Sequence, residues 1–128
     1  MKVEVSNGEL LDKLSILELK LNKIKDNKKL INITNEHSGL NPLCNNLFEN
    51  YGNDLKNLYT RLSEINAELW KIEDDIRECE RRKEFGDEFV RLARAVYFTN
   101  DKRSDVKKSI NLLTESGFVE EKSYEDYK

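Results

Sequence analysis

The chain is poor in the residues that interrupt helices and in those that build catalytic or metal sites. Its 128 residues include one proline, one histidine, two cysteines and five glycines. Glycine-rich phosphate loops, Cys-x-x-Cys zinc ribbons and Glu-x-x-His di-iron bundles each need more of these residues, or closer spacing, than the sequence offers. We therefore expect no cofactor and no catalytic residue set, and we expect that the protein is not an enzyme.

Long apolar runs are also missing. No stretch approaches the roughly 20 apolar residues that a membrane-spanning helix needs, and the amino terminus has no apolar signal region. Cys44 and Cys79 lie on one predicted helix, too far apart to form a disulfide with each other. We expect a cytoplasmic protein with reduced cysteines and no membrane contact.

Charge is abundant instead, and it is arranged around regularly spaced apolar residues. Charged residues make up 37% of the chain and hydrophobic residues 38%, with a net charge of -3. From Cys44 to Cys79, apolar or aromatic residues recur at steps of four and three without a gap. This 3.5-residue repeat is typical of a helix that presents one seam to a partner helix. The sequence therefore predicts an all-α protein that forms a single domain over residues 1–128.

Turn and capping residues divide the chain into four predicted helices. Ser6 begins the first with a capping box, and Asn41 with Pro42 begins the second after a loop that contains His37. Residues 99–101 (Thr-Asn-Asp) have the chemistry of a helix cap and predict a break. The expected helices span about residues 8–34, 42–83, 87–99 and 101–115.

The relative lengths of these helices predict their arrangement. A short loop between the first two makes a long antiparallel coiled-coil hairpin, in which the second helix overhangs the first. The two shorter C-terminal helices are expected to pack on that overhanging end. Gly52 interrupts the second helix, but the heptad phase is unbroken across it, which favours one helix that bends there. The alternative is a short helix before Gly52 and a new cap at Asn53.

The first predicted helix carries apolar residues on two opposite faces, which a single partner helix cannot cover. One row faces the second helix, and the other row includes Ile16, Leu19, Leu30 and Ile33. Trp70 is expected to be a junction anchor or an interface hot spot. We therefore expect a module for protein–protein interaction or oligomerisation, with a homodimer as one form.

Two alternative functions rest on charged residues in the C-terminal half. The break at residues 99–101 would point helix amides at basic and aromatic side chains, which suits a phosphorylated ligand or nucleic acid. These side chains are Arg91, Arg94, Tyr97, Lys102, Arg103 and Lys107. Three carboxylates on one flank of the second helix could instead hold Mg²⁺ in a metal-dependent hydrolase, namely Glu68, Asp75 and Glu78. Mutual ion pairs between the acidic and basic segments are a simpler explanation of both groups.

Three parts of the sequence resemble a known family. They are residues 4–17 (EVSNGELLDKLSIL), residues 69–78 (LWKIEDDIRE), and residues 92–103 (LARAVYFTNDKR) together with residues 119–124 (VEEKSY). The family consists of short helical proteins from bacteria and viruses and is known only as a domain of unknown function. The resemblance implies a single compact domain, and it implies no catalytic residue, ligand or partner.

Overall fold

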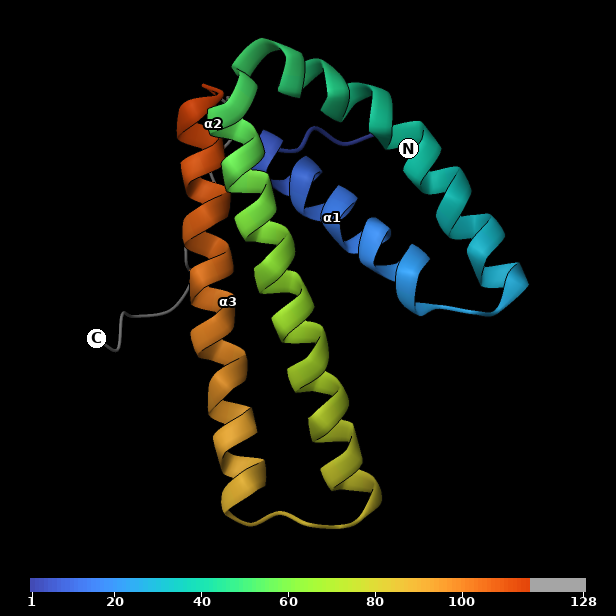
Figure 1. The fold of residues 1–128 in the computed structure, drawn as a ribbon, viewed down its shortest axis with the longest axis vertical. Coiled ribbons are helices and arrows are strands. Elements are labelled where there is room, and N and C mark those ends of the chain that lie inside the picture. Colours follow the sequence, from blue (N-terminus) through green and yellow to red (C-terminus); the bar gives the residue numbers. More distant parts are fainter. Residues whose placement is uncertain (116–128) are drawn as a thin grey trace.

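The computed structural model describes residues 1–115, which form three helices and no strand (Figure 1). Helix α1 spans Asn7–Lys23, α2 spans Asn27–Arg81 and α3 spans Asp87–Leu113. The all-helical prediction is confirmed for this part of the chain, whereas the predicted number and bounds of the helices are wrong. No helix among these residues has both the length and the apolar character needed to cross a membrane.

Helix α1 begins as its capping box predicts but ends well before residue 34. The Ser6 hydroxyl accepts a hydrogen bond from the backbone N–H of Glu9 at 3.1 Å. The chain then reverses over residues 24–26, where Asp26 caps α2 by accepting hydrogen bonds from two backbone N–H groups, at 2.9 and 3.3 Å. Because the apolar repeat continues across this reversal, the pattern alone resembles one uninterrupted helix.

Helix α2 includes the residues that were predicted to form a loop before Pro42. Pro42 and Ser38 are both exposed, so water can replace the hydrogen bond that Pro42 cannot donate to the Ser38 carbonyl. The sharp bend lies instead at Gly52, where φ is 60° and ψ is -142°. Only glycine adopts this backbone conformation readily, so the bend has a specific residue as its cause.

Helix α3 replaces the two short C-terminal helices that were predicted. Its buried positions continue at helical spacing through Leu92, Thr99, Val106 and Ile110. Because Thr99 occupies one of these inward positions, residues 99–101 lie inside the helix. The break predicted there does not exist.

Two antiparallel hairpins share α2 and meet at its bend (Figure 1). Helix α1 runs antiparallel to the part of α2 before Gly52, and α3 runs antiparallel to the part after it. Helix α1 therefore pairs first with residues 27–51, which were partly expected to belong to the same helix. The main apolar core lies where the two hairpins meet and includes Leu11, Leu14, Leu55, Leu62 and Ile110.

The α2–α3 hairpin extends well beyond α1, and we call the extension the arm (residues 70–81 of α2 and 87–98 of α3; Figure 1). Its core is a separate, smaller cluster that contains Ile72, Cys79 and Leu92. The mutual ion pairs predicted between α2 and α3 are not found among the described residues of the arm. Its charged side chains pair within one helix or with the adjoining turn, as Lys71 does with Asp75.

Candidate functional site at the helix junction

Asp12 of α1 is a buried carboxylate held by side chains from the other two helices, and its side chain is 1% exposed. Arg103 of α3 donates from Nε to Oδ1 at 3.0 Å and from Nη2 to Oδ2. Asn66 of α2 donates to Asp12 Oδ1 at 2.9 Å and to the Ser15 hydroxyl at 2.7 Å. The buried charge is thus compensated by a two-pronged guanidinium contact and an amide, as a buried carboxylate requires.

Lys107 adds a second ion pair beside the first. Its side chain is 8% exposed, and its Nζ donates to Glu9 Oε2 at 2.7 Å and lies 3.9 Å from Asp12 Oδ2. Arg103 and Lys107 are one turn apart on α3, and their two carboxylate partners are three residues apart on α1, so the pairs stack. We call these four residues the charge network: Glu9, Asp12, Arg103 and Lys107. The network is neutral as a whole and joins α1 to α3.

Close backbone packing anchors the start of α1 beside the charge network. The Gly8 N–H donates to Asn111 Oδ1 at 2.7 Å, and the Asn7 amide donates to the Thr114 hydroxyl at 2.9 Å. A Cβ atom at Gly8 would lie 2.5 Å from the carbonyl oxygen of Lys107. Glycine is therefore needed for α1 to approach α3 this closely.

A second polar cluster lies between α1 and the two parts of α2. The Tyr59 hydroxyl donates to the Glu18 carboxylate, and His37 Nε2 lies 3.7 Å from the same carboxylate. Burial, with a smaller contribution from Glu18, raises the pKa of Tyr59 and raises the pKa of the Cys44 thiol to about 11. Cys44 is therefore protonated near neutral pH and is a poor nucleophile. His37, which was predicted to be a loop residue, lies on α2 and faces α1.

Comparison with known proteins assigns the chain to a family. A family model described as "Family of unknown function (DUF6165)" matches residues 1–127. The chain belongs to DUF6165. No curated protein and no solved structure matches it.

The resemblance noted in the sequence is thus confirmed as membership of DUF6165. Two of its stretches meet in the folded chain, because residues 4–17 contain Glu9 and Asp12 and residues 92–103 end at Arg103. Residues 119–124, which contribute to the same resemblance, lie outside the described residues. Three of the four residues of the charge network therefore lie in the stretches that carry the resemblance.

In this DUF6165 chain the six residues predicted to bind an anion are divided between two places. Arg103 and Lys107 belong to the charge network, where each contacts a carboxylate. The other four are exposed along α3, namely Arg91, Arg94, Tyr97 and Lys102. Since α3 is continuous, no helix start gathers the two groups.

The three carboxylates considered for Mg²⁺ are not gathered either. Asp75 accepts a hydrogen bond from Lys71 at 3.2 Å. Arg81 donates to Glu78 at 2.9 Å and holds the pKa of that carboxyl below its usual range. Glu68 is exposed, and residues 1–115 contain no group of three or more side chains that could hold a metal ion.

The apolar residues assigned to a second face of the first helix belong to two different helices. Ile16 and Leu19 lie on α1, whereas Leu30 and Ile33 lie on α2, after the reversal. Ile33 is buried and the other three are half-buried. The face for which an additional partner was expected is therefore divided between two helices, while Trp70 is half-buried on the arm.

Sequence reasoning missed three polar residues that the fold buries at the junction: Asp12, Asn66 and Asn111. Asp12 directly follows Leu11, and Asn66 directly follows the seam residue Ile65. A polar residue among the apolar positions of a helix was the available signal, since burial of such a residue requires a partner.

Proposed function

We propose that this DUF6165 chain is a non-enzymatic helical module that acts by binding another protein, and that a second copy of the chain is its partner. The observation that carries the proposal is one side of the arm. Near the junction α1 occupies this side of the α2–α3 hairpin, and beyond the end of α1 the same side is open (Figure 1).

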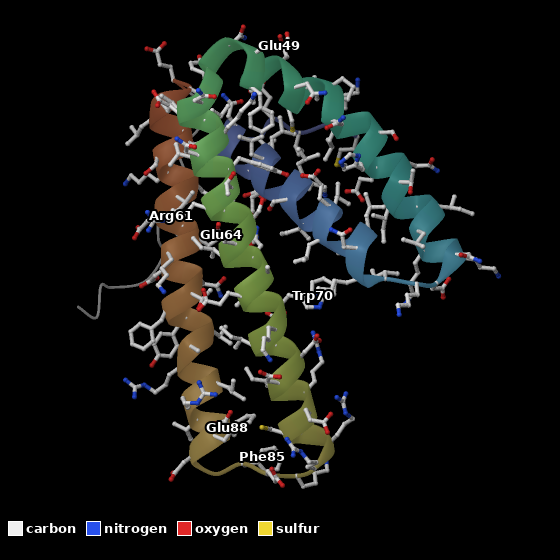
Figure 2. The ribbon with its side chains drawn as sticks, in the orientation of Figure 1. Glu49, Arg61, Glu64, Trp70, Phe85 and Glu88 are labelled. Atoms are coloured by element: carbon white, nitrogen blue, oxygen red, sulfur yellow. The ribbon has the colours of Figure 1, made fainter. Side chains whose placement is uncertain are left out.

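Helical spacing identifies the residues on that side. Asn66 and Lys107 face α1, because they bond to Asp12 and Glu9. Trp70 follows Asn66 by one turn of α2, and Figure 2 places it on the side of α2 away from α3. Five turns of α3 span about 18 residues, so stepping back that far from Lys107 leads to Phe89, and Ala93 lies one turn after Phe89 on the same side. We call Trp70, Phe89 and Ala93 the uncovered face.

The chemistry of the uncovered face suits the apolar side of a helix. Phe89 is half-buried and Ala93 is exposed, so both offer apolar surface to a partner. The large Trp70 side chain can insert between side chains of a partner helix, and the small, exposed Ala93 leaves room for a large side chain from that helix. Aromatic side chains of this kind are enriched in interface hot spots.

A second copy of the chain fits this requirement. Each arm is a pair of helices held by one small apolar cluster, and two such arms side by side complete a four-helix bundle. The association would continue, along the arm, the packing that α1 provides at the junction. We thus propose self-association through the arm, whereas the interface predicted from the sequence combined Trp70 with the second apolar face of the first helix.

Light scattering over a concentration series tests the proposal, with the emission of Trp70 as a second readout, since the chain has a single tryptophan. The mass is expected to rise from 15.1 kDa toward twice that value, and Trp70 emission to shift to shorter wavelength in parallel. Because the contact is apolar, it should persist in about 0.5 M salt, where charges are screened beyond a few ångströms.

A matched pair of substitutions on α3 distinguishes this contact from non-specific association. Ala93→Glu should weaken the dimer by at least about tenfold, because a carboxylate would be buried without a partner. Leu112→Glu should have no effect, since Leu112 is an exposed apolar residue of α3 outside the arm. A mass of 15.1 kDa at every concentration, or equal effects of both variants, would refute the proposal.

The two alternative functions receive less support. Binding of a phosphorylated ligand or nucleic acid was predicted at a helix start near residues 99–101, and α3 has no start there. A Mg²⁺-dependent hydrolase needs Glu68, Asp75 and Glu78 in one site, and the latter two are engaged in separate contacts along α2.

A further inference from the structure

A pocket opens beside the charge network, between α1, the first part of α2 and α3. Its volume is about 260 Å³, and the network carboxylates Glu9 and Asp12 lie in its wall with Arg103. Ile16 and Leu17 supply an apolar surface in the same pocket. A cavity of this size is slightly smaller than those that hold drug-sized molecules, so it suits a small metabolite.

The charges in this pocket are paired, with one exception. Arg103 pairs with Asp12. Lys13 of α1 pairs with Glu36 of α2, with 2.9 Å between Nζ and Oε1. Glu9 pairs with Lys107, which does not line the pocket. Lys20, which also lines the pocket, makes no ion pair with any residue in the described part of the chain.

Among the described residues, Lys20 is therefore the one cation in the pocket wall whose charge is not matched by an ion pair, and it lies next to an apolar surface. Lys20 lies one turn beyond Ile16 on the same side of α1, and it is half-buried. A cation in such a position is hydrated less completely than a surface lysine, which strengthens its attraction for an anion. The neighbouring carboxylates have their own cations, so they oppose such an anion less than unpaired carboxylates would.

We propose that this pocket binds a small organic anion, with its carboxylate or phosphate group at Lys20 and its carbon skeleton against Ile16 and Leu17. The site differs from the anion site predicted on α3, of which it contains only Arg103. It is also independent of the uncovered face, since no residue is shared between them. The mixed charges around the pocket favour a monoanion over a polyanion such as nucleic acid.

Titration followed by the backbone amide signals of the full chain tests the site, with sodium butyrate as the carboxylate probe and inorganic phosphate as the second probe. We expect saturable shifts of the amides of residues 13–20 and of Arg103 with at least one probe. Sodium chloride at matched ionic strength should produce no saturable change. Saturation by butyrate alone identifies a carboxylate with an apolar tail, and saturation by phosphate alone identifies a phosphoryl group.

Two lysines in the last turn of α1 provide matched variants, because Lys20 lines the pocket and Lys23 is exposed outside it. Lys20→Gln should weaken the probe affinity at least tenfold, and Lys23→Gln should leave it unchanged. Both variants should keep the wild-type melting temperature, because neither side chain makes an ion pair in the described residues. Shifts that do not saturate with either probe, or that are equal in the two variants, would overturn the proposal.

Discussion

At the scale of single residues, the charge of Asp12 makes the most deeply buried of the ion pairs that join α1 to α3. The carboxylate is almost fully buried, and it contacts Arg103 on one side and Asn66 on the other. An apolar residue could not satisfy either of these partners. Removal of a buried charge leaves its partner buried and uncompensated, which is why such changes are costly.

Asp12→Ala should therefore lower the free energy of unfolding by about 3 kcal/mol, as measured by urea denaturation. Asp75→Ala provides the control, because Asp75 belongs to an exposed ion pair with Lys71 and its loss should change stability by about 0.5 kcal/mol at most. Equal effects of the two substitutions would show that the charge network contributes no more than a surface ion pair.

At the scale of elements, two glycines of α2 differ in backbone conformation and therefore in what a side chain would cost. Gly52 has a positive φ of 60°, which a side chain would strain, whereas Gly39 lies within the helix with nothing within 4 Å of the position of a Cβ. Gly52→Ala should destabilise the protein by about 1–3 kcal/mol. Gly39→Ala should stabilise it by about 0.5–1 kcal/mol, because alanine loses less conformational freedom in a helix.

Urea denaturation of these two variants measures both signs in one experiment. Opposite signs are the expected result, since the substitution is the same and only the backbone conformation differs. If Gly52→Ala were neutral, the bend in α2 would have to be one that other residues adopt without strain. The bend would then be a consequence of packing and not of the glycine.

The sequence predicts the helical elements well where one periodic signal acts alone. The 3.5-residue repeat between Cys44 and Cys79 lies entirely within α2, and Ser6 caps α1 as expected. The reversal at residues 24–26 was missed because the apolar repeat keeps its phase across it, while Asp26 is a cap of the ordinary kind. Pro42 caused the opposite error: a helix start was predicted there, but an exposed proline can lie inside a long helix.

The candidate sites are less accessible from sequence, because they depend on contacts between residues far apart in the chain. The pairing of Asp12 with Arg103 joins positions 91 residues apart, and no local pattern specifies it. The anion-binding group was predicted from a helix break at residues 99–101. The helix α3 instead continues through these residues, and Thr99 is buried. Its members Arg103 and Lys107 were predicted to bind an anion, and their carboxylate partners on α1 were not predicted.

At the scale of the whole molecule, the two apolar clusters divide the chain into a junction and an arm. The junction cluster draws on all three helices, whereas the arm cluster has three buried residues from two helices. Regions with fewer buried contacts open at lower free energy than the rest of a protein. Amide hydrogen exchange should therefore show weaker protection in residues 72–81 and 88–96 than around Leu62 and Ile110.

Leu92→Ala tests whether the arm opens on its own. Leu92 is buried in the arm cluster, so its truncation should cost about 2–5 kcal/mol locally. If the arm is a separate cooperative unit, protection should fall within the arm and stay unchanged at Ile110. Equal losses at both places would show that the helices unfold together, because α2 and α3 each run through both clusters. Independent opening would make the arm the part of the molecule most able to adjust to a second copy.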